Sequence, residues 1–172
     1  FYLLHPQLSN SKKLCIVHNG IIENYSTIKE KLIKEGFIFN SETDTEVLVN
    51  LIEYVKDKNN VKLGEAVQIA LNQVIGAYAI AVIDKEKPDE IVVAKLGSPL
   101  CIGIGNDEHF IASDVTPFIE FTKNVVYLDD GELAIIRNHK ETFFRKISDD
   151  SLISPTVNKL ELSLDKIEKK EF

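Results

Sequence analysis

The clearest change in the pattern of apolar residues lies close to residue 76, and this change limits the folds that the chain can adopt. Before it, apolar residues recur every three or four positions, most clearly over Leu63–Val74, which predicts a helix closed by Gly76. After it, short apolar segments alternate with turn-forming residues, which predicts strands. The expected strands are Ala77–Ile83, Ile91–Leu96, Leu100–Ile104, Phe110–Ala112, Val125–Leu128, Glu132–Arg137 and Thr142–Lys146. Helices followed by antiparallel strands indicate an α+β layered domain rather than a doubly wound parallel sheet.

The first third of the chain contains both kinds of element. The expected strands here are Leu14–Val17 and Phe37–Phe39. Asn24 is expected to cap a helix that runs to about Glu35 and ends at Gly36. Thr43 and Glu46 have the spacing of a capping box, and apolar residues follow them at helical intervals. We therefore expect two helices before the one that begins near residue 63.

Turn-forming residues predict the connections in the second half. The segments Asp84–Glu90, which contains Pro88, and Asp129–Gly131 each predict a hairpin, and Val115–Phe121 predicts a short helix. Beyond Ser148 the chain becomes polar and charged. We expect residues 1–148 to form the domain, and residues 149–172 to form its end and the start of a linker.

The composition is that of an ordinary globular protein and excludes several functions. The 172 residues suffice for one domain, and the net charge of −7 argues against nucleic acid as the main partner. No apolar run has membrane-spanning length and the start lacks a secretory pattern, so we expect a cytoplasmic protein without a membrane partner. Cys15 and Cys101 lie in apolar runs without another Cys or His at metal-ligand spacing. They are expected to be buried thiols, with no metal site.

The stretch His18–Gly20 carries the clearest chemical signal. The Asn19 carboxamide and the Gly20 backbone N–H are adjacent hydrogen-bond donors after an apolar segment. Such a pair can form an oxyanion hole, which stabilises the oxygen that becomes negative when a nucleophile attacks an amide carbonyl. An Asn-Gly pair is also typical of a tight turn. Taken alone, this stretch leaves both interpretations open.

Five motifs, taken in order, resemble one family. They are His5-Pro6-Gln7, His18–Tyr25, Ser41–Val47, Gly76-Ala77-Tyr78, and Gly97–Leu100 with Phe110–Asp114 behind it. In this order they are similar to the glutaminase domain of the glutamine–fructose-6-phosphate aminotransferases, which make glucosamine 6-phosphate. The resemblance covers nearly the whole chain. The related amidotransferases of purine synthesis share the Asn-Gly pair but lack the Ser-Glu-Thr-Asp-Thr-Glu and Gly-Ser-Pro-Leu sequences.

The resemblance implies a fold, a reaction and partners. The fold would be a four-layer αββα sandwich of the N-terminal-nucleophile hydrolase type, incomplete at the N-terminus. An N-terminal Cys would attack the side-chain amide of L-glutamine and release ammonia. The ammonia would pass to fructose 6-phosphate in a second, sugar-isomerising domain, without a cofactor. The full-length protein is expected to be a homo-oligomer.

The resemblance also implies roles for individual residues. Asn19 and Gly20 would form the oxyanion hole, and Asp44 would hold the α-ammonium group of glutamine. A carboxylate at the position of Asp44 also suits the start of a helix, where it meets the positive end of the dipole, and both roles are compatible. His5 would support the substrate pocket. His18 directly precedes the oxyanion pair, but a histidine at a strand end is more often structural.

Two parts of the family's site have no counterpart in this sequence. Residue 1 is Phe where the family has its nucleophilic Cys, and the chain has no Trp, although the family's carboxylate-binding segment contains one. We expect both to lie upstream of Phe1, and we expect the chain as given not to hydrolyse glutamine. Two alternatives remain: a class II amidotransferase of the purine pathway, and a non-catalytic paralogue that binds glutamine.

Overall fold

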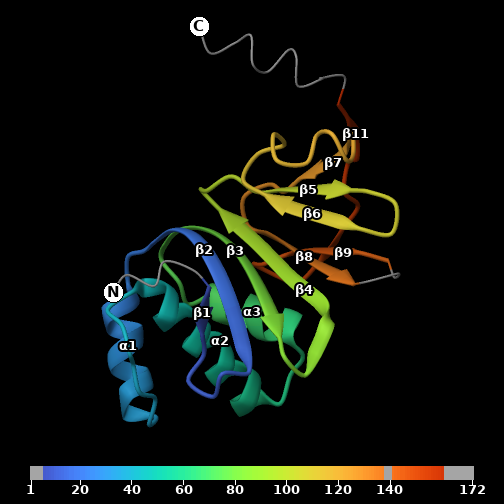
Figure 1. The fold of residues 1–172 in the computed structure, drawn as a ribbon. Coiled ribbons are helices and arrows are strands. Elements are labelled where there is room, and N and C mark those ends of the chain that lie inside the picture. The colour runs from blue at the N-terminus through green and yellow to red at the C-terminus, as the bar shows by residue number, and fades with distance from the viewer. Residues whose placement is uncertain (1–5, 138–140, 161–172) are drawn as a thin grey trace, which may run out of the picture.

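The computed structural model describes residues 6–137 and 141–160, in which helices precede most of the strands (Figure 1). The helices are α1 (Tyr25–Lys34), α2 (Asp44–Asn59) and α3 (Leu63–Leu71). The strands are β1 (Gln7–Leu8), β2 (Leu14–Ile22), β3 (Gly76–Asp84), β4 (Lys87–Leu96), β5 (Cys101–Ile104), β6 (His109–Ala112), β7 (Asn124–Tyr127), β8 (Glu132–Arg137), β9 (Phe143–Lys146), β10 (Leu152–Ile153) and β11 (Asn158–Lys159). The expected α+β class is confirmed.

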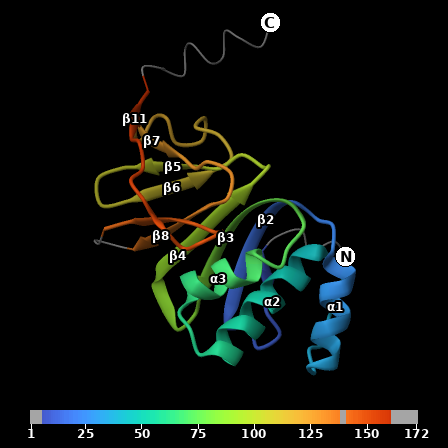
Figure 2. The same ribbon diagram turned by 180° about the vertical axis from the view of Figure 1, so that it is seen from behind.

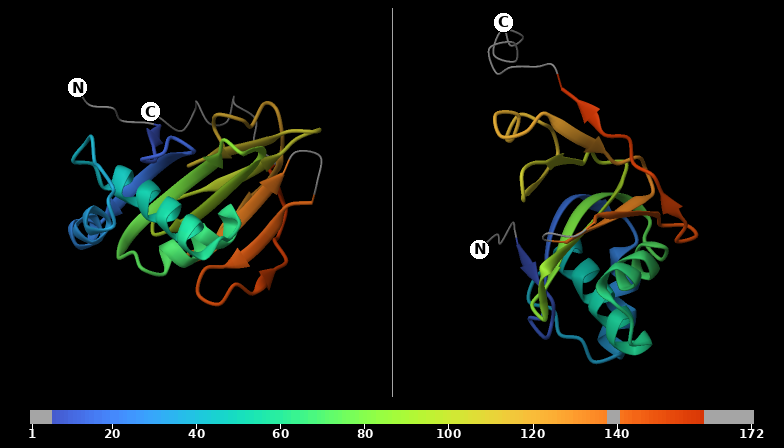
Figure 3. Two further views of the ribbon diagram at one scale, coloured as in Figure 1. Left: turned by 90° about the horizontal axis from the view of Figure 1, so that it is seen from below. Right: turned by 90° about the vertical axis from the view of Figure 1, so that its right-hand side faces the viewer.

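The strands form two antiparallel sheets that pack face to face. The large sheet has the order β1-β2-β3-β4-β8-β9-β10, and the small sheet has the order β11-β7-β5-β6. The three helices cover one face of the large sheet, and the small sheet lies over its other face (Figures 2 and 3). Strand β2 lies near one edge of the large sheet, with only the two-residue strand β1 beyond it. This position exposes part of one edge of β2.

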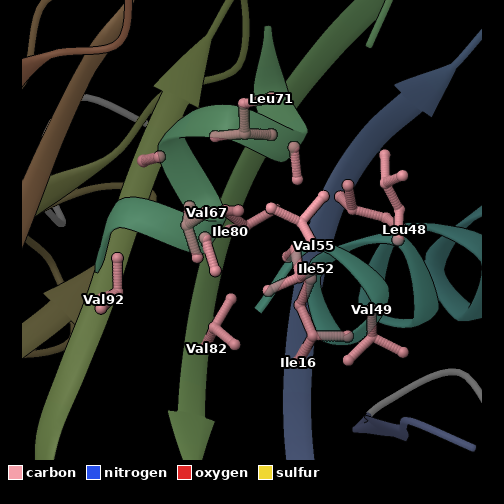
Figure 4. Close-up of a cluster of buried hydrophobic side chains, with 14 of the residues drawn as sticks. Ile16, Leu48, Val49, Ile52, Val55, Val67, Leu71, Ile80, Val82 and Val92 are labelled. Atoms are coloured by element: carbon pink, nitrogen blue, oxygen red, sulfur yellow. The ribbon is translucent and has the colours of Figure 1, made fainter. Parts of the chain in front are cut away.

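The main core lies between the helices and the large sheet. Alternate residues of the central strands point toward the helices, so that Ile16, Ile80 and Val92 meet Ile52 of α2 and Val67 of α3 (Figure 4). All five side chains are at most 1% exposed. Burial of each such side chain stabilises the fold by about 1.5–3 kcal/mol. This core fixes the middle of β2 as a rigid support.

Helix α3 ends three residues earlier than its periodicity predicts. The N–H groups of Gln73 and Val74 bond three residues back, to the carbonyls of Ala70 and Leu71 at 3.0 and 3.2 Å, so the chain tightens into a turn. Val74 still packs against the core, which explains why its position fits the apolar pattern. Gly76 does not close the helix but begins β3.

The expected strand at residues 37–39 does not form. The ring of Phe37 instead packs edge-on against Tyr54, with 6.1 Å between ring centroids, and Phe39 also packs against the core. The Ile38 N–H donates to the Asn10 side chain at 3.0 Å rather than to a neighbouring strand. The aromatic residues that suggested a strand serve here as core packing beside α2.

The expected helix at residues 115–121 is a series of turns. The N–H of Phe118 bonds to the carbonyl of Val115 at 3.1 Å, and Pro117 has no N–H to contribute. Phe118 is buried beside Val125, on the outer face of the small sheet. The described residues therefore place all three helices on one side of the sandwich and these turns on the other.

Two expected hairpins have different outcomes. The hairpin between β3 and β4 is confirmed, with only Lys85 and Glu86 outside the strands. The turn at Asp129–Gly131 joins β7 in the small sheet to β8 in the large sheet, so it does not close a hairpin. Its Asp130 carboxylate accepts a hydrogen bond from the Gly97 N–H at 2.8 Å. An Asp-Gly pair predicts the turn but not the sheet that follows it.

Residues beyond 148 contribute to both sheets. Strand β10 pairs with β9, and β11 pairs with β7. Within the described ranges, none of the helices combines the length and apolar character needed to cross a membrane.

Candidate active site

The stretch His18–Gly20 lies inside strand β2 and not in a turn. The strand runs on to Ile22, and its pairing with β3 continues without a break in register through this stretch. The tight-turn interpretation is therefore wrong. The Asn-Gly pair instead places a polar side chain and a glycine near the end of a buried strand.

Two glycines lie where β2 and β3 leave no room for a side chain. Gly20 has φ +134°, and a Cβ atom on it would lie 2.1 Å from the carbonyl oxygen of Ala77. Gly76 has φ +135°, and its Cβ would lie 2.1 Å from the carbonyl oxygen of Ile21. Neither the backbone angle nor the space suits a side chain. The two motifs that contain these glycines, far apart in the sequence, thus form one local structure.

The Gly20 N–H points to an uncovered edge of β2. The N–H of Glu23 donates to the carbonyl of Ile75, just before β3, at 2.8 Å. Because N–H groups alternate between the two edges of a strand, those of Gly20 and Ile22 point to the opposite edge. Strand β1 pairs only with the beginning of β2 and does not reach this part. Among the described strands, none covers the Gly20 amide.

Asp44 occupies the next position along this edge. It is the first residue of α2, and its Oδ2 accepts a hydrogen bond from the Ile22 N–H at 2.8 Å. Thr43 caps the helix by accepting from the Glu46 N–H at 3.3 Å, so the capping-box prediction is correct for Thr43. Because Thr43 caps α2, the Asp44 carboxylate is able to reach across to β2.

Glu46 holds the loop before Asp44. Its buried carboxylate accepts from the N–H groups of Asn40 and Ser41 at 2.8 and 2.7 Å, and from the Ser41 hydroxyl at 2.6 Å. In a capping box this carboxylate would bond the N–H of the cap residue, Thr43. Here the Glu46 carboxylate instead bonds to Asn40 and Ser41, and the spacing of the motif could not predict these bonds. Ser41–Glu46 is therefore a locally bonded frame around Asp44.

His18 faces the helices. It is buried, and its Nδ1 lies 3.0 Å from the Thr45 hydroxyl of α2. That hydroxyl in turn lies 3.5 Å from Oδ1 of Asp44, so a polar chain connects the strand to the carboxylate. Thr45 was not identified from the sequence, since a threonine in the first turn of a helix gives no distinctive signal.

The Asn19 side chain lies on the other face of β2, toward the small sheet. Asn19 is exposed, and it lines a pocket of about 350 Å³ between the two sheets. Pro99, Leu100 and Ser113 line the same pocket. The structure thus brings together His18–Gly20, Gly97–Leu100 and Phe110–Asp114.

The two cysteine thiols and the Tyr78 hydroxyl are held in their protonated forms. Burial raises the pKa of the Cys15 thiol, and burial with a nearby carboxylate raises that of Cys101 to about 11. Burial also raises the pKa of Tyr78, the partner of Gly20 in β3, to about 12. His5 lies outside the described residues. In residues 6–137 and 141–160, no group of three His, Cys, Asp or Glu side chains could hold a metal ion.

Known proteins resemble this chain in sequence and in structure. The family model of the glutamine amidotransferase domain matches residues 5–120. The glutamine–fructose-6-phosphate aminotransferase (isomerizing) of Bacteroides thetaiotaomicron is 56% identical over 96% of the chain, and that of Chlorobaculum tepidum is 46% identical over 98%. The chain spans 27% of the length of each of these relatives.

The fold resembles that of a solved glutamine amidotransferase. The glutamine phosphoribosylpyrophosphate amidotransferase of B. subtilis matches 85% of the chain with a TM-score of 0.70 and 27% identity, over 32% of its own length. This similarity confirms the layered fold of the N-terminal-nucleophile type. Together with the match to the family model, it shows that the chain belongs to the glutamine amidotransferase domain family.

Proposed function

We propose that this chain is the glutaminase part of a cytoplasmic glutamine–fructose-6-phosphate aminotransferase, which hydrolyses L-glutamine and passes ammonia to fructose 6-phosphate. The curated relatives with this name are 46–56% identical to it, whereas the solved purine-pathway enzyme is 27% identical. This difference favours the amino-sugar enzyme over the purine alternative. The nucleophile, the sugar-phosphate domain and assembly into a homo-oligomer belong to the whole protein and are part of the proposal.

The spacing of two groups on the edge of β2 carries the proposal. The N–H groups of Gly20 and Ile22 are two residues apart on the same edge, a separation of about 6.7 Å along a strand. Asp44 is bonded at the second of these positions. Glutamine has five bonds between its amide oxygen and its α-nitrogen, which span about 6 Å when extended. One glutamine can therefore place its amide oxygen at Gly20 and its ammonium group at Asp44.

The chemistry of each group suits this pose. Asn19 and the Gly20 N–H would donate to the amide oxygen as it becomes negative in the tetrahedral intermediate. The Asp44 carboxylate uses Oδ2 for the Ile22 N–H and can accept the ammonium group at its remaining lone pairs. Ligands without a cation at this position would leave a carboxylate unpaired, which favours amino acids over simple amides.

Glutaminase kinetics of the full-length protein test this assignment. Asn19→Ala should lower kcat by about 10²–10³-fold, because it removes a donor to the intermediate. Asp44→Ala should mainly raise KM for glutamine, because it removes a contact already made in the bound substrate. Asn106→Ala, in the exposed turn after β5, and Asp57→Ala, at the exposed end of α2, are matched controls that should behave as the wild type.

The acceptor distinguishes the alternatives. The proposal expects glucosamine 6-phosphate from fructose 6-phosphate and no product from phosphoribosylpyrophosphate, whereas the purine alternative expects the reverse. A full-length protein that binds glutamine without releasing ammonia would instead support the non-catalytic paralogue and contradict the proposal.

A further inference from the structure

We propose that Asn24 is a positioning residue for the oxyanion hole, an inference that rests on the function proposed above. Asn24 lies just beyond the end of β2, before α1. Its carboxamide bridges two backbone groups that precede β3: Nδ2 donates to the Gln73 carbonyl at 2.8 Å, and Oδ1 accepts from the Ile75 N–H at 2.9 Å. One side chain therefore joins the end of β2 to the start of β3.

Asn24 does not use its side chain in the local manner that its position favours. Asparagine is among the best residues for capping the N-terminus of a helix. At the start of α1, however, Asn24 makes no side-chain capping bond. Both ends of its carboxamide bond instead to residues that are 49 and 51 positions away in the sequence. The bridge thus connects the two strands at the expense of a local cap.

The ladder between β2 and β3 ends at the pair Ile22 and Gly76, and the Asn24 bridge lies just beyond this pair. Gly20 and Gly76 have no side chains, and the neighbouring Ile21 and Ile75 are 68% and 61% exposed. Apolar packing around these two side chains is therefore sparse, whereas Ile22 is buried in the core on the helix side of β2. Beyond the last pair of the ladder, the bond from the Glu23 N–H to the Ile75 carbonyl lies next to the Asn24 bridge.

This connection supports the end of the ladder that carries the Gly20 N–H. Gly20 precedes Asn24 by four residues and pairs with Tyr78 in the ladder whose end the bridge fastens. Loss of the bridge allows the strand ends to separate and the Gly20 N–H to move. A displacement of about 1 Å in a catalytic group can lower a rate by about 10²-fold. The ammonium contact at Asp44, which comes from α2, is not held by Asn24.

The test compares Asn24→Ala with Asn72→Ala in the full-length protein. Asn72 lies between α3 and β3, in the segment to which Asn24 bonds, and also donates to a backbone carbonyl, that of Ile147 at 2.8 Å, but this bond leads away from β2. We expect Asn24→Ala to lower the glutaminase kcat by about 10–100-fold with KM within about twofold. Asn72→Ala should retain the wild-type kcat. Asn24→Asp, which keeps the acceptor for Ile75 and loses the donor to Gln73, should fall between the two.

A second measurement does not depend on activity. Amide hydrogen exchange should be faster in Asn24→Ala at Glu23 and Ile75, while Asn72→Ala should leave both amides protected. Unchanged exchange in Asn24→Ala would overturn the inference directly. If the wild type is active and Asn24→Ala has the same kcat, the role of Asn24 would also be overturned, while the proposed function would stand. A wild-type protein without glutaminase activity would overturn the proposed function and, with it, this role of Asn24.

Discussion

The two ends of strand β2 are held in opposite ways. At the beginning, the turn from β1 is bonded to α2: the buried Glu53 carboxylate accepts from the Ser9 hydroxyl at 2.6 Å and the Ser11 N–H at 3.1 Å, and Asn50 accepts from the Asn10 N–H at 2.6 Å. At its other end, the strand exposes Ile21, although it buries Ile22, and it leaves the Gly20 N–H on an edge that none of the described strands covers. The first end stabilises the fold, and the second leaves polar groups available to a ligand.

Helix α2 connects the two ends. Its first residue, Asp44, bonds to the last residue of β2, and Glu53, farther along the helix, bonds to the turn before β2. A change at Asp44, at the start of α2, should therefore affect catalysis. A change at Glu53, farther along the helix, should instead affect stability. The following predictions test this separation, from the largest expected effect to the smallest.

Gly20→Ala should lower the glutaminase kcat by at least about 10²–10³-fold, the effect of losing one oxyanion donor. Its Cβ would lie 2.1 Å from the Ala77 carbonyl oxygen, so the strand must move. Gly36→Ala is the matched control, because Gly36 also has a positive φ but no atom near the added Cβ. Steady-state kinetics of both variants measure the loss of activity, and thermal melts show whether the protein has also lost stability. Full activity in Gly20→Ala would contradict the assigned role.

Glu53→Ala should destabilise the protein by roughly 1–3 kcal/mol, because it leaves buried hydrogen-bond donors without their acceptor. The glutaminase kcat should stay within about twofold of the wild type, since among the described residues the hydrogen bonds of Glu53 lead to Ser9 and Ser11 and not to the Gly20 edge. Denaturant unfolding measures the loss, and the exposed Glu65→Ala serves as the control. A kcat loss in Glu53→Ala without a stability loss would show that the two ends are not separate.

Asp44→Asn should raise KM for glutamine by about 10-fold, because charge-assisted hydrogen bonds are roughly twice as strong as neutral ones. An amide oxygen can still accept from the Ile22 N–H, so the melting temperature should not fall as far as in Asp44→Ala. Kinetics and melting curves of the two variants check this. An unchanged KM in Asp44→Asn would assign Asp44 to structure alone.

Ile21→Thr should change the free energy of unfolding by no more than about 0.5 kcal/mol, since Ile21 is 68% exposed. Denaturant unfolding of the full-length protein measures this. A loss of unfolding free energy well above that value would show that Ile21 is covered in the full-length protein. The two ends of β2 would then differ less in exposure.

The sequence predicted the elements well where one periodicity dominates. Strand β2 was recognised from its apolar start, but its continuation through Asn19 and Gly20 was not, because the Asn-Gly pair is typical of turns. Gly20 lies in a strand because it pairs with β3, and a pairing between segments far apart in the sequence leaves no local signal. The turn at Asp129–Gly131 was predicted correctly, but the hairpin expected there was wrong for the same reason.

The candidate site was predictable in its residue types but not in its contacts. The motifs identified Asn19, Gly20 and Asp44, whereas the bonds from Asp44 to Ile22 and from Asn24 to the segment before β3 depend on the tertiary fold. Glu46 was recognised as part of a capping box, yet its bonds to Asn40 and Ser41 exceed what that motif implies.

The position of a bound ligand tests the central claim most directly. A crystal structure of the full-length protein with L-glutamate, the product of the proposed reaction, should show a γ-carboxylate oxygen about 3 Å from the Gly20 nitrogen and the Asn19 carboxamide. The α-ammonium group should lie at a similar distance from the Asp44 carboxylate. A glutamate bound elsewhere, or with its ends reversed along the edge of β2, would contradict the account.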